Sequence, residues 1–481
     1  MARYLHGVRI QENPTSVPTP AANESGVPVI FGTAPVNLAA DPANATNQLF
    51  LCKTFAEAKA AVGYSDDYEK FTLCQAMDAF FKMYGVGPIV ICNVLDPETH
   101  SKAYTETVSV VNGQAVSKEQ GVLLEGLTVT KDGSTELVKD TEYTVEFNDE
   151  GYLVITVIKE GVTSLTLGGN QLDASKVAAT DIIGAYDAET GKETGTELIR
   201  MVYPKFGIAP GLLLAPGWSH IPSVGLALAE KCKEISGMFK CECVLDIDCS
   251  ETGAKKHTDV ADVKNESGYI SEHAIVVWPM VKYDGKVMAY SAAYAAMVAH
   301  TDFNNDSVPS LSPSNHELRV NATVLKDGTE VHLDVTQANE LNAEGIVTAL
   351  NMGTFKAWGN NTAAYPNVTD TKDRWICCRR FFSWWGNSFI MNYLEKVDNP
   401  ANYRLIESIV DSENVRGNSL VSQGKCAGIK MVYDRGDNPL DNVLEGKIVF
   451  RQYLAPYTPA EDILNILEFD PTMIETALGG E

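Results

Sequence analysis

Two aspartates, Asp246 and Asp248, are spaced for acid–base chemistry. They come at the end of an apolar stretch, residues 241–247, that is typical of a buried strand. Carboxylates at the C-terminal end of such a strand can face a ligand crevice in α/β proteins, but they can equally be solvated where the strand leaves the sheet. A calcium-binding EF-hand loop is excluded, because Glu251 stands where that loop requires glycine. An α/β enzyme with an inserted β-domain that acts through Asp246 and Asp248 is therefore one alternative function.

Four cysteines near this stretch suggest a second kind of chemistry, because three or four thiolates can hold zinc. They are Cys232, Cys241, Cys243 and Cys249. Two of them alternate with Leu245 and Ile247 at every second residue, which is the pattern of one packed strand face. Cysteine behaves on such a face as a small hydrophobic residue. We therefore expect core packing here, with no metal and no cofactor.

Common catalytic motifs are missing from the sequence. It contains no Gly-x-Ser-x-Gly elbow, no Gly-x-Gly-x-x-Gly loop after a strand and no His-Glu-x-x-His helix. Gly191 and Lys192 lack the earlier glycine and the following Ser or Thr of a phosphate-binding loop. The eight histidines form no motif. These observations favour a protein that is not an enzyme.

The charge balance restricts the partners. The chain has 481 residues, with 38 Lys and Arg against 63 Asp and Glu, which gives a net charge of −25. An acidic chain without a basic run is poorly suited to bind nucleic acid or an anionic membrane surface. No apolar run approaches the roughly 18 residues of a membrane-spanning helix, and the N-terminus lacks the apolar segment of a secretory signal. We expect no nucleic acid, no direct membrane binding, and buried, reduced cysteines.

The elements that would position these residues form an α/β pattern with an interruption. A capping box at Thr54 and Glu57 opens one helix, and a second helix is predicted over 68–84. Between residues 101 and 187 the helical periodicity gives way to short alternating segments separated by turn signals, which predicts an inserted β-sandwich. The α/β pattern then resumes and includes a small-residue helix over 290–302.

A last unit is predicted from about Trp358. Its aromatic-rich segment, residues 374–389, is expected to anchor a helix in a core, and a further helix is predicted over 402–415. Strands follow at 428–433 and 447–454. The second of these alternates, with Ile448, Phe450 and Leu454 on one face and Lys447, Val449, Arg451 and Tyr453 on the other.

Both ends of the chain carry a short, detached strand pattern. Residues 463–469 place Ile463, Leu467 and Phe469 on one face, after a spacer that holds Pro456 and Pro459. Residues 6–11 form a similar pattern before a proline-rich stretch. A detached strand needs a sheet to join, and that sheet can belong to another molecule.

Several stretches together resemble the tail sheath protein of contractile phages, which is also used in phage-tail-like bacteriocins and related contractile injection systems. They occur in the expected order over nearly the whole chain. The stretches are HGVRIQENPTSVPTP and VPVIFGTAP near the N-terminus, LLLAPGW (212–218), AAYAAMVAHTDFNNDSVPSLSPSN (292–315), KAWGNNT (356–362), RRFFSWW (379–385) and the final KIVFRQYLAPYTPAEDILNILEF.

The resemblance implies a structural subunit that polymerises as stacked hexameric rings around an inner tail tube and contracts to drive that tube through a cell envelope. It implies as partners further copies of the chain, the inner tube protein, and baseplate and tail terminator proteins. It implies location in a virion tail or phage-tail-like particle assembled in the bacterial cytoplasm. A carbohydrate-binding surface protein is a further alternative, but residues 101–187 lack an aromatic cluster.

The expected fold is α/β and multidomain: an α/β sheath core with an inserted β-sandwich, an α+β C-terminal domain, and extended N- and C-terminal strand arms. The predicted divisions are an N-terminal linker arm (1–20), the sheath α/β domain in two parts (21–100 and 188–355), the inserted β-sandwich (101–187), the C-terminal sheath domain (356–455) and a C-terminal linker arm with the donated strand (456–481). By resemblance, tube contact is assigned to Arg404 and Arg416. The residues expected in inter-subunit strand addition are His6, Val8, Ile10, Ile448, Phe450, Leu454, Ile463, Leu467 and Phe469.

Overall fold

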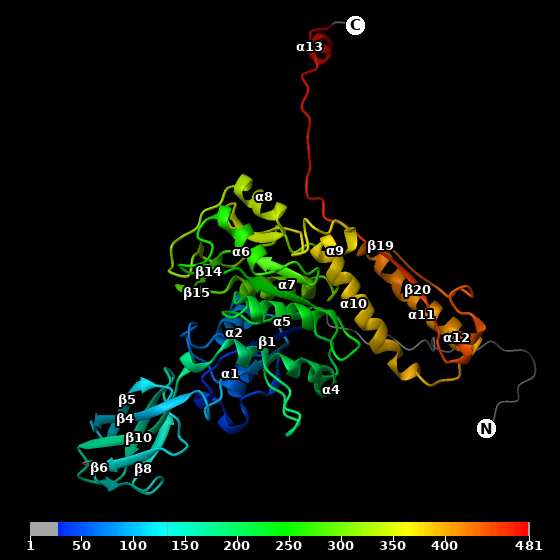
Figure 1. Cartoon of the computed structure of the whole chain (residues 1–481). Coiled ribbons are helices and arrows are strands. Elements are labelled where there is room, and N and C mark those ends of the chain that lie inside the picture. The colour runs from blue at the N-terminus through cyan, green and yellow to red at the C-terminus, as the bar shows by residue number, and fades with distance from the viewer. Residues whose placement is uncertain (1–26, 132, 480–481) are drawn as a thin grey trace, which may run out of the picture.

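An eight-stranded sheet forms the centre of the molecule in the computed structural model, which describes residues 27–131 and 133–479 (Figure 1). Its six inner strands run parallel, and an antiparallel strand closes each edge. In spatial order the strands are β18 (Phe355–Trp358), β17 (Ile346–Asn351), β13 (Ala274–Val277), β12 (Glu242–Asp246), β11 (Leu212–Leu214), β1 (Pro28–Gly32), β3 (Ile89–Asn93) and β2 (Leu49–Cys52).

Helices cover this sheet, and α7 (Tyr290–Asn304) is the most deeply buried of those packed on it. Its run of alanines lets neighbouring backbone approach closely, which explains the small-residue pattern predicted at 290–302. The other helices of this part are α1 (Phe55–Val62), α2 (Leu73–Met77), α3 (Ala179–Ile183), α4 (Val202–Phe206), α5 (Pro222–Lys233), α6 (Val260–Glu266) and α8 (Val335–Ala343). A small sheet of β14 (Met280–Tyr283), β15 (Lys286–Met288) and β16 (Ala322–Val324) lies beside them.

The helix predicted over 68–84 begins later than expected. It starts at Leu73 and continues as a π-helical stretch, Asp78–Tyr84. The backbone just before it is tied to the end of β1, because Thr72 N donates to Thr33 Oγ1 at 3.0 Å and Thr33 N donates to Thr72 Oγ1 at 3.2 Å. These long-range bonds hold residues before Leu73 outside the helix.

Two small sheets form a lobe that projects from the body (Figure 1). The first has the order β4 (Ser101–Ser109), β10 (Ser164–Leu172), β6 (Thr128–Lys131) and β7 (Thr135–Glu136). The second has the order β5 (Gln114–Gln120), β9 (Tyr152–Val157) and β8 (Tyr143–Phe147). Both sheets contribute side chains, such as Leu165 and Ile155, to a hydrophobic cluster separate from the central core.

The lobe differs from the predicted insert in which strands it contains and in the residue at which it ends. Alternation in the sequence does not predict β4, β5 or β7, because residues such as those of SKAYTETVS are mostly polar. Val177 and Ile182 pack in the core of the central sheet, although they fall within the predicted insert 101–187. This packing favours an end near Leu172, and the division of the chain into domains stays a prediction.

The C-terminal unit consists of two long helices and a two-stranded sheet. Its elements are α9 (Thr371–Arg374), α10 (Ile376–Tyr393), α11 (Tyr403–Ser422), β19 (Cys426–Val432), α12 (Leu440–Leu444) and β20 (Arg451–Pro456). Phe381 and Trp385 of the aromatic-rich segment lie in its hydrophobic cluster, so the predicted core anchor is confirmed. The helix predicted over 402–415 extends seven residues further, to Ser422.

The chain ends in an arm that leaves the body (Figure 1). Residues 457–470 have neither helix nor strand, and α13 (Pro471–Ala477) follows them. The strand predicted over 463–469 is therefore not formed within the single chain. Residues 6–11 lie outside the described residues. Among the helices that the structure describes, none has the length and apolar character needed to cross a bilayer.

Candidate assembly interface

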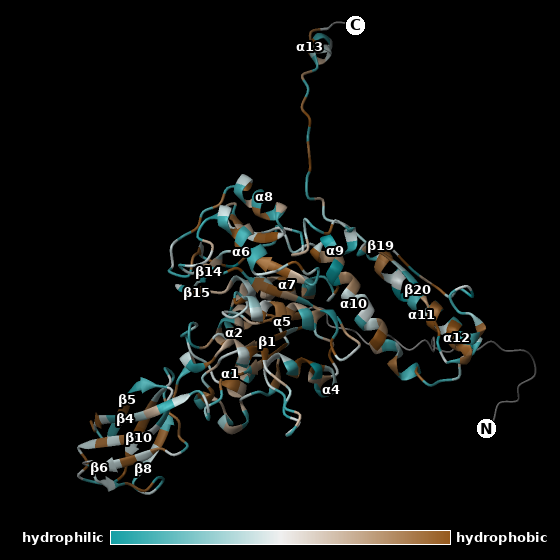
Figure 2. Cartoon of the chain, in the orientation of Figure 1, coloured by the Kyte–Doolittle hydropathy of each residue, from teal (hydrophilic) through white to brown (hydrophobic). Residues whose placement is uncertain are grey.

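The C-terminal arm exposes apolar side chains along most of its length (Figure 2). Ile463, Leu467 and Phe469 are 84%, 86% and 80% exposed. The opposite face of the predicted strand carries Leu464 and Ile466, and both are exposed as well. Each large apolar side chain left in water forgoes roughly 1.5–3 kcal/mol of burial. An exposed apolar segment of this kind marks a candidate interaction surface.

Contacts of Glu461 hold the start of the arm to the body. Glu461 accepts from Arg374 Nη2 at 3.1 Å and from Asn360 Nδ2 at 3.4 Å. The Arg374 guanidinium is itself placed over the rings of Tyr365 and Trp375, at 4.5 and 4.0 Å from their centres. The arm therefore leaves from a fixed position, and the exposed residues begin directly after it.

The sheet of β19 and β20 offers open edges. Its antiparallel register pairs Ile429 with Leu454 and Met431 with Gln452. In the part of the chain that the structure describes, each of these strands pairs only with the other. An unpaired edge presents a row of N–H and C=O groups that can accept a further strand.

The alternation predicted for residues 447–454 is confirmed, but the predicted first residue of the strand is wrong. Ile448, Phe450 and Leu454 lie on the half-buried side, and Val449 and Tyr453 are exposed. The strand begins at Arg451 instead of residue 447. The Asn438 side chain explains the shift, because it accepts from Val449 N at 2.7 Å and donates to Val449 O at 2.8 Å. These bonds occupy backbone groups that would otherwise pair along the strand.

Helix α11 supports the inner face of this sheet at close range. A Cβ added to Gly417 would lie 2.7 Å from Cβ of Ile429, so only glycine allows this approach. Asn414 accepts from Met431 N at 2.8 Å and donates to Met431 O at 3.1 Å. Gln452 donates to the fully buried Glu413 at 2.9 Å. The sheet is thus rigidly backed, with its edges free.

The two arginines assigned to tube contact have different surroundings. Arg404 is exposed on the first turn of α11. The Arg416 side chain is only 15% exposed, and its guanidinium lies 3.6 Å from the centre of the Trp385 ring. Arg416 also donates to Ser388 Oγ at 2.7 Å and to Glu413 at 3.1 Å. These contacts join α10 to α11, so the geometry favours a packing role for Arg416.

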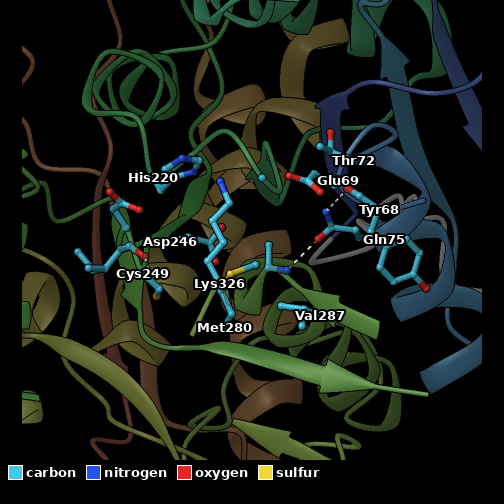
Figure 3. Close-up of a pocket in the computed structure, with 14 residues that line it drawn as sticks. Tyr68, Glu69, Thr72, Gln75, His220, Asp246, Cys249, Met280, Val287 and Lys326 are labelled. Atoms are coloured by element: carbon cyan, nitrogen blue, oxygen red, sulfur yellow. Dashed lines mark hydrogen bonds between the residues drawn. The ribbon is translucent and has the colours of Figure 1, made fainter. Parts of the chain in front are cut away.

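Asp246 is a fully bonded residue of the core. It lines a cavity of about 210 Å³ with His220 and Lys326 (Figure 3). Its carboxylate accepts from Ser219 Oγ at 2.7 Å and from Ser291 N at 2.8 Å. Burial raises the pKa of Asp246, although these hydrogen bonds oppose the shift. The residue therefore joins β12 to α7 and to the loop after β11.

Asp248 and the cysteines also have structural surroundings. Asp248 accepts from Ser250 N and Ser250 Oγ, both at 2.9 Å, and so closes a local turn. Cys232 and Cys241 lie 3.4 Å apart between their sulfurs, and all ten cysteines are buried. Within the described ranges, no group of three or more His, Cys, Asp or Glu is arranged to hold a metal.

Solved structures share this fold over nearly the full chain. A chain of the anti-feeding prophage baseplate, in a 6-fold symmetrised structure, matches with a TM-score of 0.56 at 15% identity, covering 98% of this chain and 100% of that one. A chain of the PVC sheath complex, an extracellular contractile injection system in its contracted state, matches with a TM-score of 0.59 at 14% identity, covering 98% and 99%. The fold is thus the one found in sheath and baseplate structures of contractile injection systems.

Proteins related to this chain in sequence are described as tail sheath proteins. The chain is 28% identical to the tail sheath protein of Burkholderia phage BcepMu over 496 aligned residues, covering 100% of this chain and 99% of the relative. It is 26% identical to the major tail sheath protein of Serratia phage KSP20 (64% and 76% covered) and 22% identical to the tail sheath protein of Escherichia phage P2 (78% and 87% covered). No family model matches the chain. The predicted resemblance is confirmed: the chain is a homologue of phage tail sheath proteins.

Proposed function

We propose that this chain is the structural subunit of a contractile tail sheath, which polymerises as stacked hexameric rings around an inner tube and contracts to drive that tube through a cell envelope. The observation that carries the proposal is the pairing, in one chain, of an exposed apolar arm with a two-stranded sheet whose edges are open. An arm and a sheet edge of this kind complete each other when copies of the chain assemble.

The joint between subunits is strand addition. Residues 463–469 of one copy, with Ile463, Leu467 and Phe469, add to the β19–β20 sheet of another. The N-terminal residues 6–11, with His6, Val8 and Ile10, add from a further copy. Backbone hydrogen bonds then satisfy both edges, while Ile448, Phe450 and Leu454 belong to the receiving side. The net charge of −25 makes subunits repel at long range, so short-range pairing must supply the affinity.

Contraction is a rigid-body rotation of subunits about these joints. Residues 457–462, which include Pro459, separate the donated strand from β20, so the body can turn while the strand stays paired. The further partners are the inner tube, the baseplate and the tail terminator, and the particle is a phage tail or a phage-tail-like bacteriocin assembled in the bacterial cytoplasm. The protein acts by assembly and not as an enzyme.

Deletion of residues 460–481 tests strand donation. We expect a soluble monomer with a melting temperature close to that of the wild type, because Ile463, Leu467 and Phe469 bury almost nothing within their own chain. Ile466→Pro is expected to have the same effect because proline cannot donate to a ladder, whereas Ile466→Val retains the donor and is the control. Sedimentation and electron microscopy measure assembly. Tube formation by the deletion variant would refute strand donation, and a collapsed melting temperature would mean that the arm pairs within its own subunit.

The inner tube is contacted by the exposed start of α11, at Arg404. Charge reversal by Arg404→Glu is expected to weaken co-sedimentation with the tube while leaving the melting temperature and sheath assembly unchanged, because Arg404 is exposed. Arg416→Glu is a contrasting variant and should destabilise the subunit through the loss of the Trp385 contact. Unchanged tube binding by the Arg404 variant would remove this site.

A further inference from the structure

Two short helices carry apolar faces that nothing in the described chain covers. Met473, Ile474 and Leu478 of α13 and its C-terminal end are 71%, 50% and 84% exposed. By helical geometry they fall on one side together with Ala477, and the other side is polar. Leu440 and Leu444 of α12 are 71% and 75% exposed and lie one turn apart on one face.

Helix α12 lies at one end of the open sheet. It belongs to the connection between the end of β19 at Val432 and the start of β20 at Arg451. That connection is fixed by the bonds between Asn438 and Val449 and by the ion pair between Arg451 and Asp437. The exposed leucines of α12 therefore sit beside the first residues of β20, at a defined place.

The length of the arm brings α13 to this place. The candidate strand 463–469 has seven residues, and β20 has six. A strand that runs antiparallel to β20, as β19 does, ends beside Arg451. Only Asp470 separates Phe469 from the first residue of α13, Pro471, and one residue spans at most about 3.6 Å. The helix must then begin next to α12.

We propose that α13 of one copy packs its apolar face on Leu440 and Leu444 of α12 in a second copy, as a clamp at the end of the added strand. The inference rests on the proposed function and names a contact that strand addition by itself does not require. It assigns the added strand to the free edge of β20, in the antiparallel direction.

Helix α13 packs on α12 of a second copy and not of its own chain, because the arm leaves the body at the end of the sheet opposite α12. Strand β20 runs from α12 to the opposite end of the sheet, and the arm starts there. The bonds of Glu461 to Arg374 and Asn360 hold it at that end, and Figure 1 shows the arm directed away from α12. A second copy has no such restraint on where its α13 lies.

Disulfide trapping between two differently substituted chains tests the contact. Leu444→Cys in one full-length chain and Ile474→Cys in another are mixed, assembled and oxidised. The native cysteines are all buried, whereas Leu444 and Ile474 are exposed, so the introduced thiols react selectively. We expect a covalent dimer in the assembled fraction. Thr476→Cys, on the polar side of α13, is the matched control and should give little dimer.

Other outcomes overturn the inference. Trapping of Ile474→Cys by Ala427→Cys, at the far end of the sheet, would mean that the strand adds in the other direction or to β19. A chain with both Leu444→Cys and Ile474→Cys that closes on itself at high dilution would mean that α13 docks within its own subunit. Tubes without any of these dimers would reject the clamp and leave the proposed function intact. Failure of the wild-type chain to assemble would reject both.

An assembly titration adds a readout that does not depend on oxidation. Leu444→Asp is expected to raise the concentration needed for sedimentable tubes on the order of tenfold, because it places a charge in the apolar contact. Its melting temperature should be unchanged, since Leu444 is exposed in the single chain. Val138→Asp, at an apolar position of the lobe that is 60% exposed, is the control and should assemble as the wild type does. Equal titrations for the two variants would contradict the clamp.

Discussion

Arg380 and Asp302 form a buried ion pair that joins α10 of the C-terminal unit to α7 of the central core. The two side chains are 3% and 1% exposed, and Arg380 Nη1 lies 3.2 Å from Asp302 Oδ1. Arg380 Nη2 also donates to Asp302 Oδ2, so the contact is bidentate. The C-terminal unit is therefore fastened to the central core by a buried charge pair.

Removal of the Asp302 charge is expected to destabilise the subunit strongly. Asp302→Asn leaves the Arg380 guanidinium buried without its counter-charge, which costs about 3–5 kcal/mol of the free energy of unfolding. Denaturant unfolding measures the loss. The control is Glu230→Gln, because Glu230 and its partner Lys233 are 73% and 49% exposed, and a loss of at most about 1 kcal/mol is expected there. Equal effects for the two variants would contradict a special role of the buried pair.

The contact of α11 with β19 requires glycine. Gly417→Ala would place a methyl group 2.7 Å from Cβ of Ile429, so the helix must move, at a cost of about 1–3 kcal/mol. Gly386→Ala in α10 meets no atom within 4 Å and is expected to be neutral or to stabilise by up to about 1 kcal/mol. The melting temperature of the Gly417 variant should therefore fall, and that of the Gly386 variant should stay the same or rise. A stabilised Gly417 variant would show that the helix adjusts freely.

Lys264 is expected to make the free energy of unfolding depend on pH in the alkaline range. Its ammonium is buried and donates to Tyr365 O at 3.1 Å, and burial lowers its pKa from 10.5 to about 8. The folded chain releases this proton at lower pH than the unfolded chain. Lys264 therefore does not reduce the free energy of unfolding above pH 10.5, and the reduction grows as the pH falls to about 8.

The test compares the wild type with Lys264→Met, which cannot titrate. Between about pH 7 and about pH 9.5, the unfolding free energy of the wild type should rise relative to that of the variant by about 1–2 kcal/mol. The tyrosines and cysteines titrate in both proteins, so their contributions cancel in the difference. A difference that stays constant with pH would refute the lowered pKa.

The lobe is expected to be dispensable for folding and assembly when it is removed at its paired ends. Ser101 and Leu172 lie opposite each other in the register of β4 and β10, so a short Gly/Ser linker can replace residues 102–171. The melting temperature and tube formation should stay close to those of the wild type. Replacement of residues 101–187 should destabilise the chain, because it also removes Val177 and Ile182 from the central core. An insoluble short deletion would show that the lobe supports the body.

Several features of the proposed joint can be predicted from the local sequence pattern. The alternation of Ile448, Phe450 and Leu454 predicted the correct face of the last strand, and the composition of residues 463–469 marked the arm that stays exposed. The leucines of α12 and the apolar side of α13 were missed, although the i, i+4 spacing of Leu440 with Leu444 and of Ile474 with Leu478 was a signal for them. Both helices are too short for periodicity to stand out.

The sequence by itself determined which faces of its strands and helices are apolar, the small-residue character of α7 and the family resemblance, because these depend on neighbouring residues and on the repeat of the backbone. Only the tertiary structure decided that Arg416 stacks on Trp385, that Asn438 delays the start of β20 and that Val177 belongs to the central core. Those outcomes depend on side chains that are distant along the chain or separated by a turn. The spacing of residues along the chain does not predict which distant residue such a side chain will contact.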